Sequence, residues 1–69
     1  MFTIIDYIGQ VCTGGYNADE IFAEIFRIYA ATPDENYDID ICYEDTNDRY
    51  PMRAGFDLDD FRNWLCNLD

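Results

Sequence analysis

Two segments in which apolar and polar residues alternate constrain the fold of this chain more than any other feature. In residues 37–44 and 49–56 every second residue is apolar, which is the pattern of a strand that buries one face. The residues between them, Glu44-Asp45-Thr46-Asn47-Asp48, favour a turn, so we expect the two segments to form a β-hairpin. A hairpin with one apolar face needs other elements to cover that face.

The register of this hairpin is expected to place Glu44 opposite Arg49 across a four-residue loop. Apolar residues then face apolar residues, and Asp40 faces Arg53 on the outer side. A shift by one residue would place apolar residues opposite polar ones. The expected apolar pairs are Tyr43–Tyr50, Ile41–Met52, Ile39–Ala54 and Tyr37–Phe56.

Helical spacing of apolar residues predicts helices on both sides of the hairpin. The clearest covers residues 18–31, where Asn17 is suited to cap the helix and Glu20 follows three residues on. Another is expected to begin at Asp57 or Leu58. Its apolar face comprises Leu58, Phe61, Trp64, Leu65 and Leu68.

The N-terminal segment has two possible structures. Ile4, Ile8, Val11 and Cys12 recur at helical spacing, and the glycines at 14–15 would end a helix there. The alternative is a strand over residues 2–8, because Phe, Ile and Ile near its start are typical strand residues. We expect the helix and keep the strand as the alternative.

These segments together predict one α+β domain over residues 1–69. Its expected order is helix, helix, β-hairpin, helix, with the helices packed on one face of a short antiparallel sheet. Cys12 and Cys66, at helix positions, are expected to fill gaps in the core, whereas Cys42 is expected to be exposed on the polar face of a strand. The aromatic residues expected at the centre are Phe22, Phe26, Phe61 and Trp64.

The balance of charge excludes several classes of function. Fifteen Asp and Glu against four Arg give a formal net charge of −11, so direct binding to nucleic acid or to an anionic membrane is not expected. The chain has no His, Lys or Ser, which are the bases and nucleophiles of most enzymes, and we therefore expect no enzyme and no cofactor. We expect a cytoplasmic protein, a monomer or a homodimer, without a signal peptide or membrane span.

The acidic residues concentrate in one part of the chain. Residues 34–48 contain seven acids and no base, although Asp40 and Glu44 are expected to pair with Arg53 and Arg49. This segment lacks the Gly and the distal Glu of an EF-hand loop, so no specific metal site is expected. The candidate partner-binding residues are Asp34, Glu35, Asp38, Asp40, Glu44, Asp45 and Asp48.

Carboxylates on alternate positions of a strand have a spacing that suits a basic partner. Asp38 and Asp40 would lie about 6.6 Å apart along a strand, of the order of the gap between neighbouring phosphates of one nucleic-acid strand. A rigid protein that displays such carboxylates can occupy the basic groove of a nucleic-acid-binding protein. The alternative explanation for the charge is solubility alone.

The sequence resembles a broad class of proteins in its length, its charge, its lack of Lys and the clusters Asp34-Glu35, Asp38-Ile39-Asp40 and Glu44-Asp45-Thr46-Asn47-Asp48. This class comprises the small, very acidic proteins that phages and mobile elements use against bacterial defence, the anti-CRISPR and anti-restriction proteins. The resemblance implies a stoichiometric inhibitor that looks like DNA to the complex it blocks, acting in the host bacterial cytoplasm. The alternative function is a structural or assembly protein that oligomerises by pairing the edge of its hairpin with another subunit, an edge that Pro51 would block in part.

Overall fold

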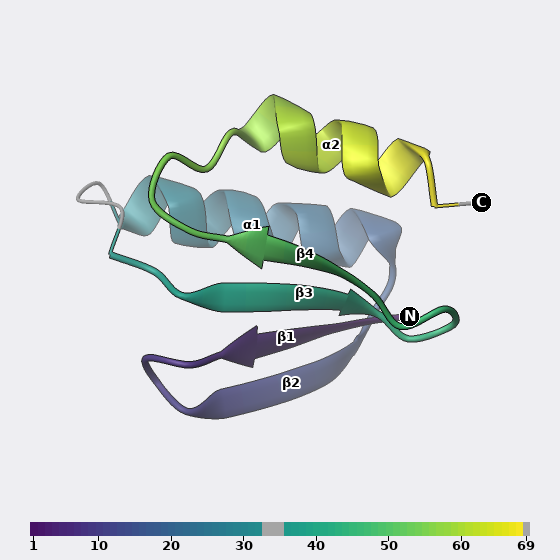
Figure 1. The fold of residues 1–69 in the computed structure, drawn as a ribbon, viewed down its shortest axis with the longest axis horizontal. Coiled ribbons are helices and arrows are strands. Elements are labelled where there is room, and N and C mark those ends of the chain that lie inside the picture. The colour runs from purple at the N-terminus through teal and green to yellow at the C-terminus, as the bar shows by residue number, and fades with distance from the viewer. Residues whose placement is uncertain (33–35, 69) are drawn as a thin grey trace.

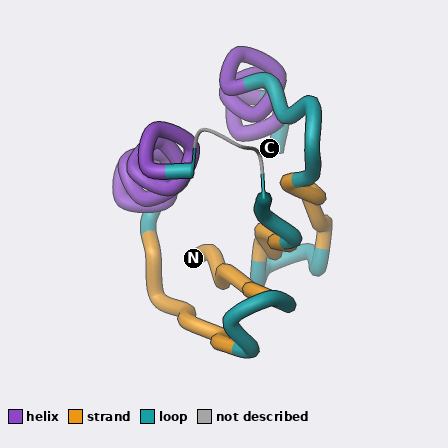
Figure 2. Tube along the Cα trace, turned by 90° about the vertical axis from the view of Figure 1, so that its left-hand side faces the viewer, coloured by secondary structure: helices purple, strands orange, loops and turns teal. Residues whose placement is uncertain are grey.

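A four-stranded antiparallel sheet in the order β2-β1-β3-β4 forms one layer of the protein, and the helices form the other (Figure 1). The computed structural model describes residues 1–32 and 36–68. Figure 2, a view along the helices, shows both of them on the same side of the sheet. The elements are β1 (Phe2–Asp6), β2 (Val11–Tyr16), α1 (Ala18–Ala31), β3 (Ile39–Tyr43), β4 (Asp48–Met52) and α2 (Leu58–Cys66).

The expected N-terminal helix was wrong: this segment is a second hairpin, formed by β1 and β2. The carboxylate of Asp6 closes its turn by accepting hydrogen bonds from the backbone N–H groups of Ile8 and Gly9, both at 3.0 Å. The glycines do not end a helix. They lie at a bulge between two strand pairs, where Gly15 has a φ of 87° that few other residues adopt. The order is therefore strand, strand, helix, strand, strand, helix, while the α+β class and the helices on one face are confirmed.

The expected hairpin of residues 37–56 exists, but its register differs from the expected one by two residues. Ile41 pairs with Tyr50, and Cys42 rather than Glu44 lies opposite Arg49. A shift of two residues keeps every side chain on its face, so apolar alternation alone does not distinguish the two registers. The turn decides, because Asn47 adopts a positive φ of 63° and donates its backbone N–H to the carbonyl of Tyr43 at 2.8 Å.

The helix boundaries follow the expected capping residues. Asn17 Oδ1 accepts the backbone N–H of Glu20 at 2.8 Å, and Glu20 Oε1 accepts the backbone N–H of Asn17 at 3.0 Å. These reciprocal bonds satisfy two donors that the first turn of α1 would leave unpaired. Asp57 caps α2 with a single bond, in which its carboxylate accepts the N–H of Asp59 at 2.9 Å. Neither described helix is long and apolar enough to cross a membrane.

The core lies between the helices and the inner face of the sheet. Its fully buried side chains are Phe61, Ile21, Ile25, Ile41 and Met52. Of the four aromatic residues expected at the centre, Phe61 is confirmed, and Phe22 and Trp64 pack partly buried against it. The expectation that Phe26 is central was wrong. Its side chain is 51% exposed, because the sheet and α2 leave one stripe of α1 facing solvent.

All three cysteine expectations were wrong. Cys12 and Cys66 are exposed, because Cys12 lies on the edge strand β2 and Cys66 ends α2. Cys42 points to the outer face but is buried there, since Thr3 and Arg49 pair with it from the two neighbouring strands. All three thiols are free.

Candidate partner-binding surface

The candidate acidic residues divide into three groups in space. Asp38 and Asp40 lie on the outer face of the sheet, at and just before β3. Glu44 and Asp45 lie in the β3–β4 turn, and Asp48 begins β4. The remaining two, Asp34 and Glu35, lie outside the described residues.

The outer-face group is a network centred on Asp40. Its carboxylate accepts hydrogen bonds from Tyr7 at 2.9 Å, from Arg53 at 3.1 Å and from Arg49 at 3.4 Å. Arg53 also pairs with Asp38 at 3.0 Å, and it donates to the backbone carbonyl of Ile39 at 2.7 Å. We call Tyr7, Asp38, Asp40, Arg49 and Arg53 the sheet-face network.

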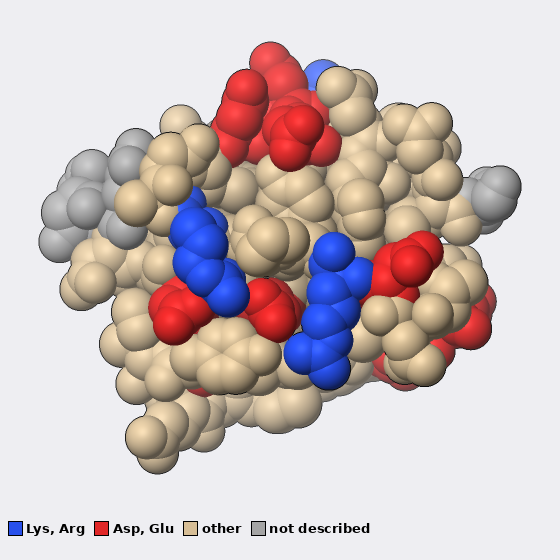
Figure 3. Space-filling model, in the orientation of Figure 1, with Lys and Arg blue, Asp and Glu red and all other residues tan. Residues whose placement is uncertain are grey.

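The electrostatics of this network hold Asp40 in its ionised form. Partial burial opposes ionisation of Asp40, but the hydrogen bonds from Tyr7, Arg53 and Arg49 outweigh it and hold its pKa below the usual value. The same bond to Asp40 raises the pKa of Tyr7. Figure 3 shows the two basic side chains flanked by acidic ones on the face that the helices leave open. The two carboxylates and two guanidinium groups balance, so the sheet-face network has no net charge.

The acidic residues in the β3–β4 turn and at the start of β4 are not neutralised in the way that Asp40 is. Among the described residues, Glu44, Asp45 and Asp48 form no ion pair. Within residues 1–32 and 36–68, the side-chain hydrogen bond of Glu44 comes from the neutral hydroxyl of Thr3, at 2.8 Å. The expected pair of Asp40 with Arg53 is therefore confirmed, whereas the expected pair of Glu44 with Arg49 was wrong, because Arg49 pairs with Asp40 instead.

The first turn of α1 brings two more carboxylates to the same end of the molecule. Figure 1 shows the β3–β4 turn and the start of α1 at one end of the long axis. Asp19 and Glu20 lie in that first turn, and both are exposed. We call the five residues Asp19, Glu20, Glu44, Asp45 and Asp48 the acidic end.

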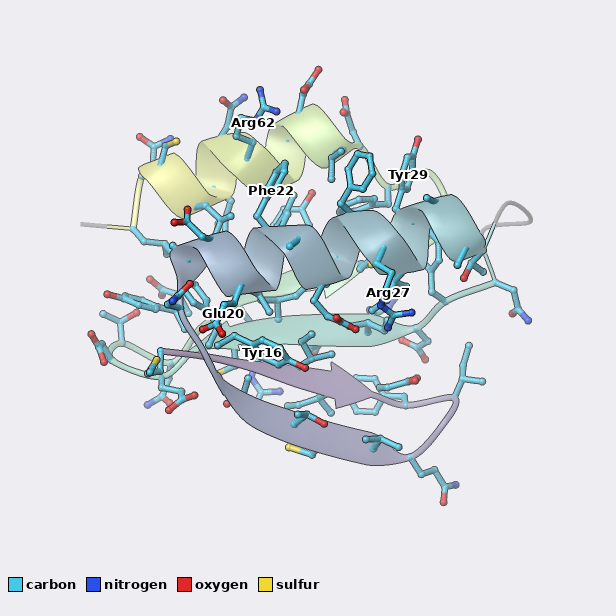
Figure 4. All side chains as sticks on the ribbon, turned by 180° about the vertical axis from the view of Figure 1, so that it is seen from behind. Tyr16, Glu20, Phe22, Arg27, Tyr29 and Arg62 are labelled. Carbon is cyan, nitrogen blue, oxygen red and sulfur yellow. The ribbon has the colours of Figure 1, made fainter. Side chains whose placement is uncertain are left out.

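Two cavities of about 250 Å³ flank α1 on the helix side of the molecule (Figure 4). One opens between α1 and the β1–β2 hairpin, and the other lies between α1 and α2, where Arg62 covers the ring of Phe22 at 5.4 Å. In the first, a hydrogen bond from Arg27 lowers the pKa of Glu24. Glu24 is thus an ionised acceptor at neutral pH rather than a proton donor. No group of three potential metal ligands occurs within residues 1–32 and 36–68.

Sequence reasoning missed Tyr7 as a partner of Asp40 and missed the first cavity altogether. Both depend on the β1–β2 hairpin, which places Tyr7 beside β3. The strand-type residues at the start of the chain were the signal that could have found them. Comparison of this chain with protein-family models, curated proteins and solved structures gave no match.

Proposed function

We propose that this protein is a stoichiometric inhibitor that covers the basic nucleic-acid site of a bacterial defence complex with its acidic end. The observation that supports this proposal is the contrast between the two acidic surfaces. In the sheet-face network Asp38 and Asp40 are neutralised by Arg49 and Arg53, while the acidic end has no ion pair among the described residues. Like charges held close together oppose folding, so a patch that is left unpaired is available to a cationic partner.

The favourable energy of such binding is the electrostatic attraction that the phosphates of nucleic acid have for the same basic groove. Carboxylates that approach a basic groove gain the electrostatic attraction that nucleic acid would gain there, and the net charge of −11 steers the approach. The turn residues Glu44, Asp45 and Asp48 are the central contacts in this proposal, because their charge is not cancelled by a neighbouring arginine. Asp38 and Asp40 would instead keep the sheet-face network in place.

The experiment that tests the proposal is capture of a partner from a bacterial lysate at low salt. The wild-type protein is expected to retain a nucleic-acid-binding complex that elutes with rising salt and is displaced by DNA. Asp45→Lys combined with Asp48→Lys should abolish the capture. Both side chains are exposed, so the melting temperature should change little.

Matched single variants separate position from total charge. Asp45→Lys and Asp59→Lys each change the net charge by two units, but Asp59 is exposed at the start of α2, outside the acidic end. The proposal expects weaker capture by Asp45→Lys than by Asp59→Lys. Equal capture by the two variants would mean that the acidic end is not the contact surface.

A further inference from the structure

Strand β2 is an edge of the sheet that has neither charge nor proline against pairing, although the bulge at residues 14–15 confines a regular added strand to residues 11–13. In the described part of the chain no strand lies on its outer side, and its residues Val11–Tyr16 include no charge and no proline. The opposite edge, β4, carries Asp48, Arg49 and Pro51. Charged residues and proline are the common means by which proteins keep an edge strand from adding another strand. The two edges of this sheet therefore differ in a way that leaves β2 competent to pair.

The ladder shows which backbone groups of β2 face outward. Beside the two ends of β1, the N–H of Tyr7 bonds to the carbonyl of Asp38 at 2.9 Å, and the N–H of Glu44 bonds to the carbonyl of Met1 at 3.0 Å. The odd-numbered residues of β1 therefore direct their backbone hydrogen bonds toward β3. Even-numbered residues of β1 then bond toward β2, and their partners include Val11 and Thr13. Cys12, between them, points its N–H and carbonyl away from the sheet.

A cavity opens beside this edge. It has a volume of about 250 Å³ and lies between α1 and the β1–β2 hairpin. Its apolar wall is formed by Ile4, Ile28 and Ile39, and its charged lining consists of the ion pair of Glu24 with Arg27 and the carboxylate of Asp6. Figure 4 shows Tyr16 lying between α1 and the sheet, and Arg27 reaching down from α1 toward the same strands.

We propose that β2 accepts an extended segment of a partner protein as a fifth strand, with an arginine or lysine side chain of that segment in the cavity. The outward backbone groups of β2 require an extended occupant, as in other cases of strand addition. Alternate side chains of an added strand point to the helix side, into the cavity. A long cationic side chain lays its apolar stem on the isoleucines and brings its charge to Asp6, since Glu24 already pairs with Arg27.

Charge favours this occupant over a second copy of the chain. A second copy would bring a further net charge of −11, and its own β2 has no basic residue to place in the cavity. A basic segment meets the carboxylate of Asp6 at the cavity and the attractive field of a protein whose net charge is −11. The inference does not require that the acidic end and β2 bind the same partner.

The test is selection of peptides from a displayed library of random twelve-residue sequences against the full-length protein. Selected peptides are expected to alternate apolar and polar residues. They are also expected to carry Arg or Lys at one of the positions whose side chains point to the helix side of the sheet, toward the cavity. Cys12→Pro removes the outward N–H of β2 and should weaken their binding at least tenfold, as Pro51 blocks β4. Cys12→Ala also removes the thiol but keeps the N–H, and it should bind like the wild type. A melting curve for each variant checks that the fold is intact.

Four results would overturn the inference. One is the absence of any enriched peptide, and another is equal binding of the selected peptides to Cys12→Pro and Cys12→Ala. The third is a wild-type dimer in sedimentation that becomes a monomer in Cys12→Pro, which would assign the edge to a second copy. The fourth is a set of peptides that lose binding to Asp45→Lys with Asp48→Lys but not to Cys12→Pro, which would locate the binding at the acidic end rather than at β2.

Discussion

Two phenylalanines that look alike in sequence should differ sharply in their contribution to stability. Phe61 is fully buried, and its ring lies 5.3 Å from Tyr50, 5.9 Å from Trp64 and 6.1 Å from Phe56 between ring centroids. Phe26 is 51% exposed on α1. Both occupy apolar positions of helices, so the same substitution tests whether the structure distinguishes them correctly.

The magnitudes follow from burial. Phe61→Ala removes a buried ring and leaves a cavity, which costs about 3–5 kcal/mol. A chain of this length has a total stability of roughly 3–10 kcal/mol, so this variant should be largely unfolded or close to it. Phe61→Leu conserves most of the volume and should cost about 1.5 kcal/mol, which keeps the protein measurable. Phe26→Ala should cost less than about 1 kcal/mol.

Urea denaturation measured by fluorescence provides the assay, because Trp64 stacks on Phe61 and reports on this part of the core. Far-ultraviolet circular dichroism gives an independent measure of the same transition. The reasoning would be refuted if Phe26→Ala destabilised the protein as much as Phe61→Ala, because Phe26 would then be buried in solution.

Three further predictions concern the network, the bulge and the thiols. Because the pKa of Asp40 is lowered in the fold, its contribution to stability is present at neutral pH and is lost as the pH falls through that lowered pKa. The variant Asp40→Asn should therefore destabilise the protein at pH 7 and lose this effect in acid. The control variant Asp45→Asn should have little effect on stability at either pH. Gly15→Ala should cost about 1 kcal/mol in urea denaturation, because φ is 87° there, and Gly15→Asn should cost less. A thiol reagent should modify Cys12 and Cys66 in the folded protein and Cys42 only after unfolding, and labelling of Cys42 at the same rate would contradict its burial.

The capping residues in the sequence correctly predicted where both helices begin, because these starts depend on contacts between residues close together in the chain. The start of α1 follows from the reciprocal hydrogen bonds of Asn17 and Glu20, and the start of α2 follows from Asp57. Both are short-range contacts that a sequence displays directly. The turn of the second hairpin was likewise visible, although its register was decided by Asn47 rather than by apolar pairing.

The N-terminal segment could not be assigned in the same way, because its structure depends on a distant partner. Residues of β1 pair with β3 across about half of the chain, as in the pair of Ile4 with Ile41. Burial against β3 and α1 outweighs the helical spacing of the apolar residues in this segment. The misassigned hairpin also hid the features that depend on it: the exposed Cys12, the Tyr7–Asp40 bond and the free edge of β2.

The sequence predicted which acidic residues form the candidate surface, but not which of their carboxylates are neutralised by arginine. The sequence locates the acids between residues 34 and 48, and it also suggests that arginines neutralise some of them. Which carboxylates are neutralised depends on three-dimensional contacts: Asp40 receives both Arg49 and Arg53, while Glu44 receives neither. This distinction moves the proposed contact from the whole acidic segment to the acidic end.

The central claim is that the acidic end competes with nucleic acid for one site, and a competition titration tests it most directly. Labelled DNA is bound to the complex captured from the lysate, and the protein is added in increasing amounts. The account predicts that DNA is released with a stoichiometry of one protein per site, and that Asp45→Lys with Asp48→Lys releases none at the same concentrations. A complex that holds the protein and the DNA at the same time would contradict it.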